Sequence, residues 1–158
     1  MTIHIMQIAT QFPTPLAHVI ASIESSCNPF ATRFEPGYYN MYKPGASQHY
    51  ASMWDVSEPT AHVLRSMSFG LYQIMGGTVL QFYAGTPLEY CADVQAQHAA
   101  FSKFVSSYMG LGSVPDLQEL LADPARLAEF AVRYNGPGGR VTYADAIRAH
   151  AKQLGYAQ

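Results

Sequence analysis

Capping residues followed directly by proline recur along this chain, and they constrain its fold more than any other feature. Each pair offers a side-chain oxygen to the first free N–H groups of a helix, and then a proline that suits the first turn. The pairs are Thr14-Pro15, Thr86-Pro87 and Asp123-Pro124. Together with Ser57, Asp116 and the stop signals Asn28-Pro29, Gly136 and Gly155, they predict helices over 15–26, 58–67, 87–109, 116–122, 124–135 and 142–154.

The remaining segments give little support to a sheet. Residues 30–55 are rich in aromatic groups and in Pro-Gly pairs, so we predict a long loop or short irregular helices there. Residues 68–77 end in two glycines and predict another short helix, and only 2–8 alternates like a strand. With 158 residues, of which 49% are hydrophobic, the chain is long enough for one buried core. We therefore predict a mainly α, single-domain protein over 1–158 with little or no β-sheet.

Composition excludes several classes of function. The net charge is −2 and the nine Lys and Arg residues are scattered, whereas a nucleic-acid-binding face needs clustered basic residues. No segment has the length of a membrane span or the pattern of a secretory signal, so we expect no stable membrane anchor. Neither CxxC nor HExxH spacing occurs, and we expect no metal and no cofactor. Cys27 and Cys91 are predicted free thiols, or a bridge in an oxidising compartment.

Glu24 is the first candidate for chemistry. It falls in the last turn of the predicted helix 15–26, whose apolar face is formed by Leu16, Val19, Ile20 and Ile23. The helix macrodipole is negative at that end, and together with partial burial it predicts a raised pKa for this carboxyl group. A carboxylic acid kept protonated near neutral pH can act as a general acid. The alternative is a glutamate that points into solvent beyond the helix end.

Three separated motifs then stand in a fixed order. Glu24-Ser25 followed by Asn28-Pro29 and Ala31, then Gly70-Leu71-Tyr72-Gln73-Ile74-Met75, and finally Tyr134-Asn135-Gly136 with Tyr143-Ala144 resemble the motifs of the soluble lytic transglycosylases. Ser66-Met67-Ser68-Phe69-Gly70 and Tyr134-Asn135-Gly136-Pro137-Gly138 look still more like the phage N-acetylmuramidase endolysins. The motifs span almost the whole chain.

This resemblance implies a lysozyme-like fold and cleavage of the β-1,4 bond between N-acetylmuramic acid and N-acetylglucosamine. It also implies that Glu24 is the catalytic acid and that the Tyr134 hydroxyl holds its carboxylate. By the same resemblance, the substrate-binding residues are expected to be Ser25, Tyr72, Gln73, Asn135 and Tyr143. Gln73 and the backbone around Tyr72 would line the sugar cleft, and Asn135 would support a turn.

The reaction type depends on a second carboxylate. A hydrolase that inverts configuration needs a base across the sugar, with the two carboxyl groups about 6.5–9.5 Å apart. Glu35 is the candidate for that role, Asp55 is a more distant one, and an ion pair with Arg33 is the structural alternative for Glu35. A lytic transglycosylase needs no second carboxylate, because Glu24 returns to act as the base and a 1,6-anhydro sugar forms.

The hypothesis is a peptidoglycan glycosidase, most simply a phage or prophage endolysin acting as a lytic transglycosylase. The alternatives are a hydrolytic muramidase that uses Glu35 and a non-catalytic protein that binds glycan strands. We expect a monomer that accumulates in the host cytoplasm and reaches the periplasm and cell wall once the membrane is breached.

Overall fold

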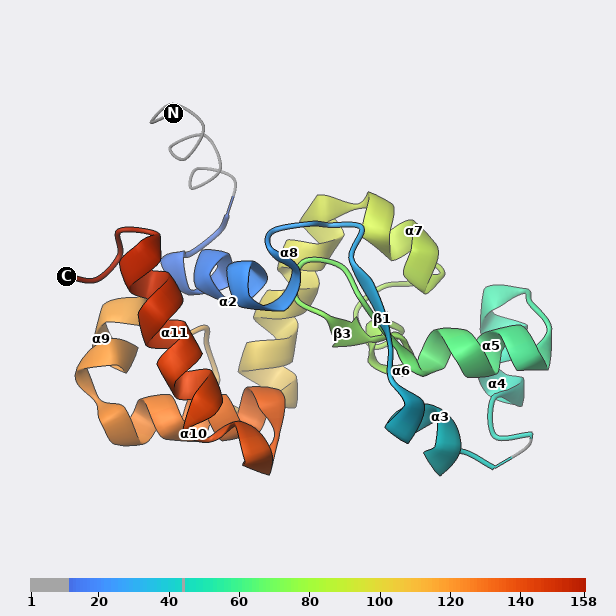
Figure 1. Cartoon of the computed structure of the whole chain (residues 1–158). Helices are drawn as coiled ribbons and strands as arrows, with labels where there is room; N and C mark the ends of the chain where they lie inside the picture. The colour runs from blue at the N-terminus through green and yellow to red at the C-terminus, as the bar shows by residue number, and fades with distance from the viewer. Residues whose placement is uncertain (1–11, 44) are drawn as a thin grey trace. The chain divides into compact units, whose positions relative to one another are not determined.

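The computed structural model describes residues 12–43 and 45–158, and it is mainly helical (Figure 1). This confirms the predicted mainly α class. The chain divides into two compact units, each described by itself below. Of the described residues, unit one consists of 12–27 and 101–158, and unit two of 28–43 and 45–100. One boundary therefore follows Cys27, and the other falls inside one helix, α8 (Val94–Lys103). The lysozyme-like fold and the single domain stay predictions.

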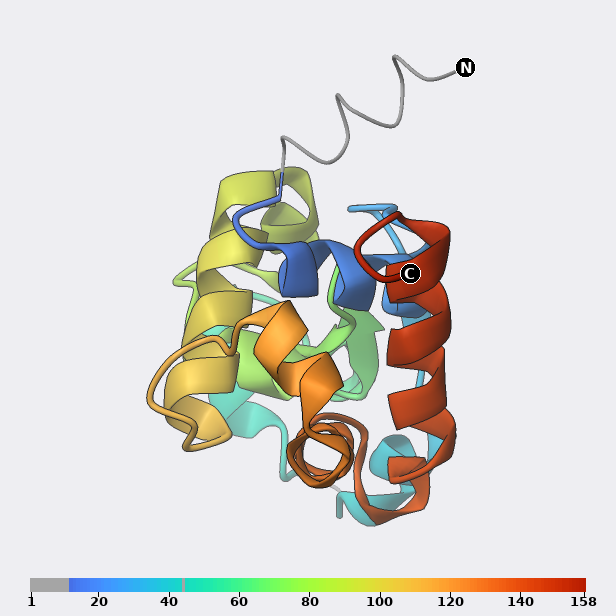
Figure 2. The same cartoon turned by 90° about the vertical axis from the view of Figure 1, so that its left-hand side faces the viewer.

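Unit one is built from helices at the two ends of the chain. Its elements are α2 (Pro15–Ser25), the end of α8, the π-helical turn η1 (Phe104–Tyr108), α9 (Leu117–Ala122), α10 (Pro124–Asn135), the 3-10 turn η2 (Pro137–Gly139) and α11 (Thr142–Gln153). Helix α11 lies beside both α2 and α10 (Figure 2). The core between them is aliphatic and aromatic, with Leu16, Val19, Ile20, Leu127, Phe130 and Ile147 almost fully buried.

The predicted caps open the helices of unit one. The Thr14 hydroxyl accepts a hydrogen bond from the Ala17 amide at 3.1 Å. The Asp116 and Asp123 carboxylates do the same for α9 and α10, each accepting from two amides. These side chains satisfy N–H groups that a helix start leaves unpaired, which is why the starts could be predicted locally.

The end of α2 differs from the prediction. The helix ends at Ser25, ahead of Asn28-Pro29, because Ser26 and Cys27 both adopt the left-handed conformation, with φ of 53° and 61°. The Ser26 and Cys27 amides donate back to Ser22 and Ala21 carbonyl oxygens. The turn is therefore closed by backbone hydrogen bonds, and the proline lies beyond it.

Polar contacts also join α2 to the C-terminal segment. Residues along α2 meet partners in reverse sequence order, so α2 and α11 run antiparallel. The pairs are His18 Nδ1 with the Tyr156 hydroxyl at 3.0 Å, Ser22 Oγ with His150 Nδ1 at 2.9 Å, and Glu24 with Tyr143 at 2.5 Å. The last turn of α2 consequently lies against the first turn of α11.

Unit two combines short helices with a small sheet. Its elements are β1 (Thr32–Phe34), α3 (Pro36–Met41), α4 (Gln48–Trp54), α5 (Glu58–Arg65), β2 (Met67–Phe69), β3 (Ile74–Met75), α6 (Gly76–Val79), α7 (Pro87–Ala92) and the first part of α8. The strands form an antiparallel sheet in the order β1-β2-β3, with Arg33 opposite Ser68 and Ser68 opposite Met75. The Ser57 cap and the Thr86 capping box are both present, as predicted.

The prediction of a helix over 68–77 was wrong. This segment contains β2, a turn and β3, and α6 begins at Gly76, where the sequence predicted an end. The turn needs the left-handed conformation at Gly70 (φ 75°) and at Gln73 (φ 48°). A helix cannot pass through two such residues, and β1, which was also not predicted, supplies the hydrogen-bonding partner for β2.

The predicted helix over 87–109 is interrupted. Asp93 adopts an extended conformation after α7, and its carboxylate accepts from the Ala96 amide at 2.9 Å to start α8. Val94, at the start of α8, is 38% exposed, although the apolar pattern of 87–109 would place it on a buried face. After α8 the chain widens into a π-helical turn over Phe104–Tyr108, where the Met109 amide donates to the Phe104 carbonyl.

Gln97 holds several segments of unit two together. Its side chain is fully buried, and its Oε1 accepts from the Leu71 amide at 2.7 Å. Its Nε2 donates to the carbonyl oxygens of Pro29, Tyr90 and Cys91 at 3.0–3.2 Å. One amide side chain thereby joins the segment before β1, the end of α7 and the turn between β2 and β3.

The remaining predictions about the fold have mixed outcomes. The strand expected over 2–8 lies outside the described residues. Cys27 and Cys91 are free thiols, in agreement with the first of the two alternatives. In the described part of the chain, no helix combines the length and the apolar character needed to cross a membrane.

Candidate active site

Glu24 meets a tyrosine from the opposite end of the chain. The Tyr143 hydroxyl, in the first turn of α11, donates a hydrogen bond of 2.5 Å to Glu24 Oε1. Glu24 is half-buried, whereas Tyr143 is only 6% exposed. A buried donor of fixed position holds the carboxyl group in one orientation, which is a requirement for a group that transfers a proton.

The environment of Tyr143 favours the un-ionised form of its hydroxyl. Burial, and then the neighbouring Tyr134 and Glu24, raise the pKa of the Tyr143 hydroxyl well above its ordinary value. An un-ionised hydroxyl carries a hydrogen that it can give to Glu24, and it adds no second negative charge beside the carboxyl group.

Two helix ends face Glu24. The C-terminus of α2 carries partial negative charge, and the N-terminus of α11, which begins at Thr142, carries partial positive charge. The two dipoles act on the carboxyl group with opposite sign. The dipole of α11 therefore opposes that of α2 at the carboxyl group, and the raised pKa of Glu24 stays a prediction.

Tyr134 supports this pair through its ring. The rings of Tyr134 and Tyr143 stack with centroids 5.7 Å apart and planes at 14°. The resemblance predicts that the Tyr134 hydroxyl holds Glu24 and that Tyr143 binds substrate. In the structure, the Tyr143 hydroxyl is a donor to the Glu24 carboxylate. No local pattern in the sequence marks this role, because residues 24 and 143 meet only through the pairing of α2 with α11.

An aromatic cluster continues from Tyr134 to the π-helical turn. Phe130 stacks on Tyr134 at 5.8 Å, and Phe104 meets it edge-on at 5.6 Å. Phe104 opens η1, and π-helical turns are rare in proteins and occur frequently at functional sites. The sequence predicted a regular helix here, so this feature was missed.

The other two candidates in unit one have structural partners. Ser25 Oγ donates to the Ala21 carbonyl at 3.0 Å, as a serine inside a helix often does. Asn135 lies at the end of α10, and a Cβ atom at Gly139 would come within 2.8 Å of its Nδ2. The Asn135 side chain thus packs on the backbone of η2.

In unit two, Gln73 is held by its own loop. Its Nε2 donates to the carbonyl oxygens of Gly70 at 2.9 Å and Ala31 at 3.2 Å, and its Oε1 accepts from Ser68 Oγ at 2.8 Å. The side chain therefore closes the turn between β2 and β3 and ties it to the segment before β1.

The side chain of Tyr72 is buried, and the expected contact of its backbone with a sugar stays a prediction. Tyr72 is 1% exposed, and its hydroxyl pairs with His98 Nδ1 at 2.7 Å. The polar tip of the ring therefore has its hydrogen-bond partner inside unit two.

Glu35 forms the predicted ion pair. Its Oε1 accepts from Arg33 Nε at 2.6 Å and lies 3.5 Å from Ser68 Oγ. The side chain of Arg33 is 62% exposed and that of Glu35 is 25% exposed. Ser68 links Glu35 to Gln73, so these two predicted site residues lie together in unit two. The other group, in unit one, consists of Glu24, Tyr134 and Tyr143.

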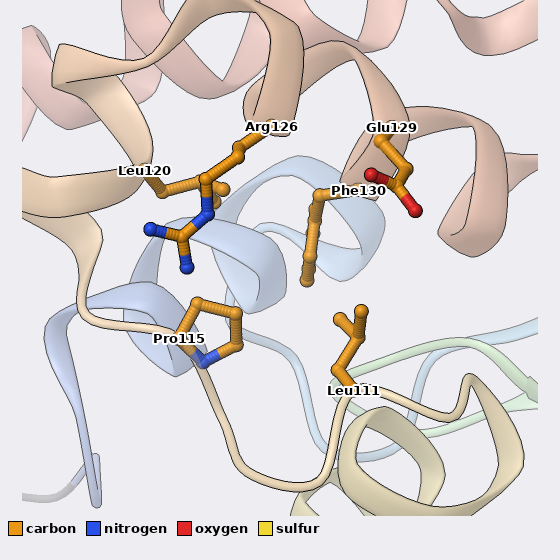
Figure 3. A pocket seen from close by; sticks show the side chains of 6 residues that line it. All are labelled: Leu111, Pro115, Leu120, Arg126, Glu129 and Phe130. Atoms are coloured by element: carbon orange, nitrogen blue, oxygen red, sulfur yellow. The ribbon is translucent and has the colours of Figure 1, made fainter.

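A separate hollow in unit one is too small for a sugar. Its volume is about 50 Å³, whereas pockets for small molecules usually measure 300–1,000 Å³. Figure 3 shows the Arg126 side chain reaching toward Pro115, with the Phe130 ring and Leu111 beside it. The lining is completed by Leu120 and Glu129. Within residues 12–43 and 45–158, no group of three or more His, Cys, Asp or Glu side chains could hold a metal ion.

No protein-family model, curated protein or solved structure matches this chain. The resemblance to lytic transglycosylases and phage muramidases therefore depends on the sequence motifs alone.

Proposed function

We propose that this protein is a peptidoglycan glycosidase that acts as a lytic transglycosylase with Glu24 as its general acid and base. The observation that carries the proposal is the hydrogen bond of 2.5 Å from Tyr143 to Glu24 Oε1. This hydrogen bond fixes Glu24, from the first motif, in a half-buried position beside Tyr143, which follows the third motif.

In the proposed reaction, Glu24 protonates the glycosidic oxygen as the bond from that oxygen to C1 of N-acetylmuramic acid breaks. The C6 hydroxyl of the same sugar then bonds to C1 and returns its proton to Glu24. A 1,6-anhydro sugar forms, and no water is consumed. Tyr143 positions the carboxyl group for both transfers and itself keeps its proton, because its pKa is raised.

The environment of Glu35 favours this reaction over hydrolysis. The carboxylate already pairs with Arg33 and contacts Ser68, which is the arrangement expected of a structural ion pair. A hydrolytic muramidase with Glu35 as base remains the alternative reaction, and a non-catalytic glycan-binding protein is the alternative of another class. Under the proposal the partner is the glycan strand, and the protein is a phage or prophage endolysin that reaches the wall from the host cytoplasm.

The test is Glu24→Gln, which keeps the shape of the side chain but has no proton to donate. We expect a folded protein that still sediments with purified sacculi and has lost lytic activity, since general acid catalysis contributes typically ~10²–10⁴-fold. Glu119→Gln is the matched control, because this exposed glutamate lies 3.8 Å from Arg126 and should be dispensable for clearing.

Mass spectrometry of the wild-type products then separates the reactions. Anhydro ends support the transglycosylase, and reducing ends, one water heavier, indicate the muramidase. Clearing by Glu24→Gln at the wild-type rate would contradict the assignment of Glu24, and a wild-type protein that binds sacculi without clearing them would indicate the non-catalytic alternative.

A further inference from the structure

We propose that a hollow in unit two between α3 and α5 binds an organic ammonium group, such as a primary amine on an alkyl chain. The hollow has a volume of about 400 Å³, within the range usual for small-molecule pockets. It is lined from the α3 side by Tyr39, Asn40 and Tyr42 and from the α5 side by Glu58, Pro59 and His62. Both helices are seen in Figure 1.

Glu58 contributes to the hollow a carboxylate with one buried oxygen that is unpaired in the described chain. Glu58 Oε1 is buried and has no hydrogen-bond partner among the described residues. The ion pairs of the described chain involve other acidic residues, so Glu58 has no cation within 4.0 Å there. The start of α5 favours a negative charge at this position. Because both oxygens share that charge, an ammonium group bound to the carboxylate would offset the burial of Oε1.

Two tyrosine rings, those of Tyr39 and Tyr42, also line the hollow. Cations bind to the faces of tyrosine rings, and the neighbouring rings of Tyr42 and Tyr50 already bind the Arg65 guanidinium group. The Arg65 guanidinium carbon lies 3.6 Å from the centroid of the Tyr42 ring and 4.3 Å from that of Tyr50. Tyr39, which is 39% exposed, adds a second ring to the hollow itself. Among the described residues, no Lys or Arg side chain lines the hollow, and the cation in contact with a lining ring is Arg65, on Tyr42.

The other groups in the lining exclude competing ligands. His62 Nε2 pairs with the Tyr39 carbonyl at 3.0 Å, so it must carry a hydrogen, and Nδ1 pairs with Ser47 Oγ at 3.3 Å. With both nitrogens engaged, His62 is no metal ligand. An anion would be repelled by Glu58, and a neutral ligand would bring no opposite charge to it. An alkylammonium group satisfies the carboxylate and places its methylene carbons against the rings.

The experiment uses the full chain and two lysine derivatives that differ in one charge. Nα-acetyl-lysine amide keeps its ε-ammonium group, and Nα,Nε-diacetyl-lysine amide has lost it. Each is titrated while the backbone amide resonances of residues 39–42 and 58–62 are followed by NMR. We expect the charged derivative to shift these resonances and to bind at least about tenfold more tightly than the neutral one.

Two variants test the source of the selectivity. Glu58→Gln keeps the shape and removes the charge, so it should weaken binding of the charged derivative at least about tenfold. Asp55→Asn removes one charge from the same unit at an exposed left-handed position that Asn tolerates, and it should leave binding unchanged.

Equal binding of the two derivatives would overturn the proposal. So would an unchanged affinity in Glu58→Gln, resonance shifts confined to other residues, or no shift at the solubility limit of the charged derivative. Preferential binding of N-acetylglucosamine at these resonances would replace it with a sugar site.

Discussion

Replacing Tyr143 with phenylalanine should separate positioning of the carboxyl group from simple packing. The substitution removes the hydroxyl that donates to Glu24 Oε1 and keeps the ring that stacks on Tyr134 at 5.7 Å. Glu24 is half-buried, so solvent can replace part of the lost hydrogen bond in the resting protein. Solvent cannot, however, hold the carboxyl group in the fixed orientation that proton transfer requires.

The magnitudes follow from that difference. A hydrogen bond to a charged group is worth about 1.5–3 kcal/mol, and if the loss falls on the transition state it lowers kcat/KM roughly 10- to 150-fold. The stability cost of a solvent-compensated hydrogen bond is smaller, about 0.5–1.5 kcal/mol. For a chain of this size, we expect a fall in Tm of about 1–6 °C.

The assay compares the clearing rate of purified sacculi with the Tm of each variant. The matched control is Tyr156→Phe, which removes another partly buried hydroxyl of unit one, the one that pairs with His18 at 3.0 Å. The control should show a comparable fall in Tm with undiminished clearing. Clearing by Tyr143→Phe within twofold of wild type would refute the positioning role, and so would an equal loss of activity in the control.

Three further outcomes follow from the structure. Glu35→Gln should keep most of the clearing activity and release anhydro products, because an exposed ion pair with Arg33 is worth about 0–1 kcal/mol, whereas loss of a catalytic base would cost ~10²–10⁴-fold. Burial raises the pKa of Tyr90 and Tyr143 in the folded protein, so on raising the pH the unfolded chain loses these two protons first. The free energy of unfolding should therefore fall above about pH 10, by about 1.4 kcal/mol per pH unit for each tyrosine. Urea titration at several pH values measures this fall. Tyr90→Phe should unfold at the same or a higher temperature and show a shallower alkaline fall, since the Tyr90 hydroxyl is buried without a hydrogen-bond partner among the described residues; a lower Tm would contradict this.

The local features of the fold could be predicted from the sequence. Thr14, Ser57, Thr86 and Asp123 open helices at the predicted positions because each cap uses only the next two or three residues. The break at Asp93 is also local, since its carboxylate accepts from the amide three residues later, but the long apolar pattern of 87–109 concealed it.

Features that depend on distant partners could not be predicted. The segment 68–77 became a hairpin because β2 pairs with β1, more than thirty residues earlier in the chain. The Tyr143 donor to Glu24 could not be identified from spacing either, because the two residues are 119 positions apart and meet only through the antiparallel pairing of α2 and α11. The motifs located the glutamate, and the tertiary structure supplied the Tyr143 hydroxyl.

The burial of Gln97 has a consequence for hydrogen exchange. The Leu71 amide donates to Gln97 Oε1 inside unit two, and the same side chain holds the carbonyl oxygens of Pro29, Tyr90 and Cys91. Solvent reaches that amide only after Gln97 has left its position, which releases all four partners at once. The exchange rate of the single Leu71 amide therefore reports how often the segment before β1, the end of α7 and the β2–β3 turn open together.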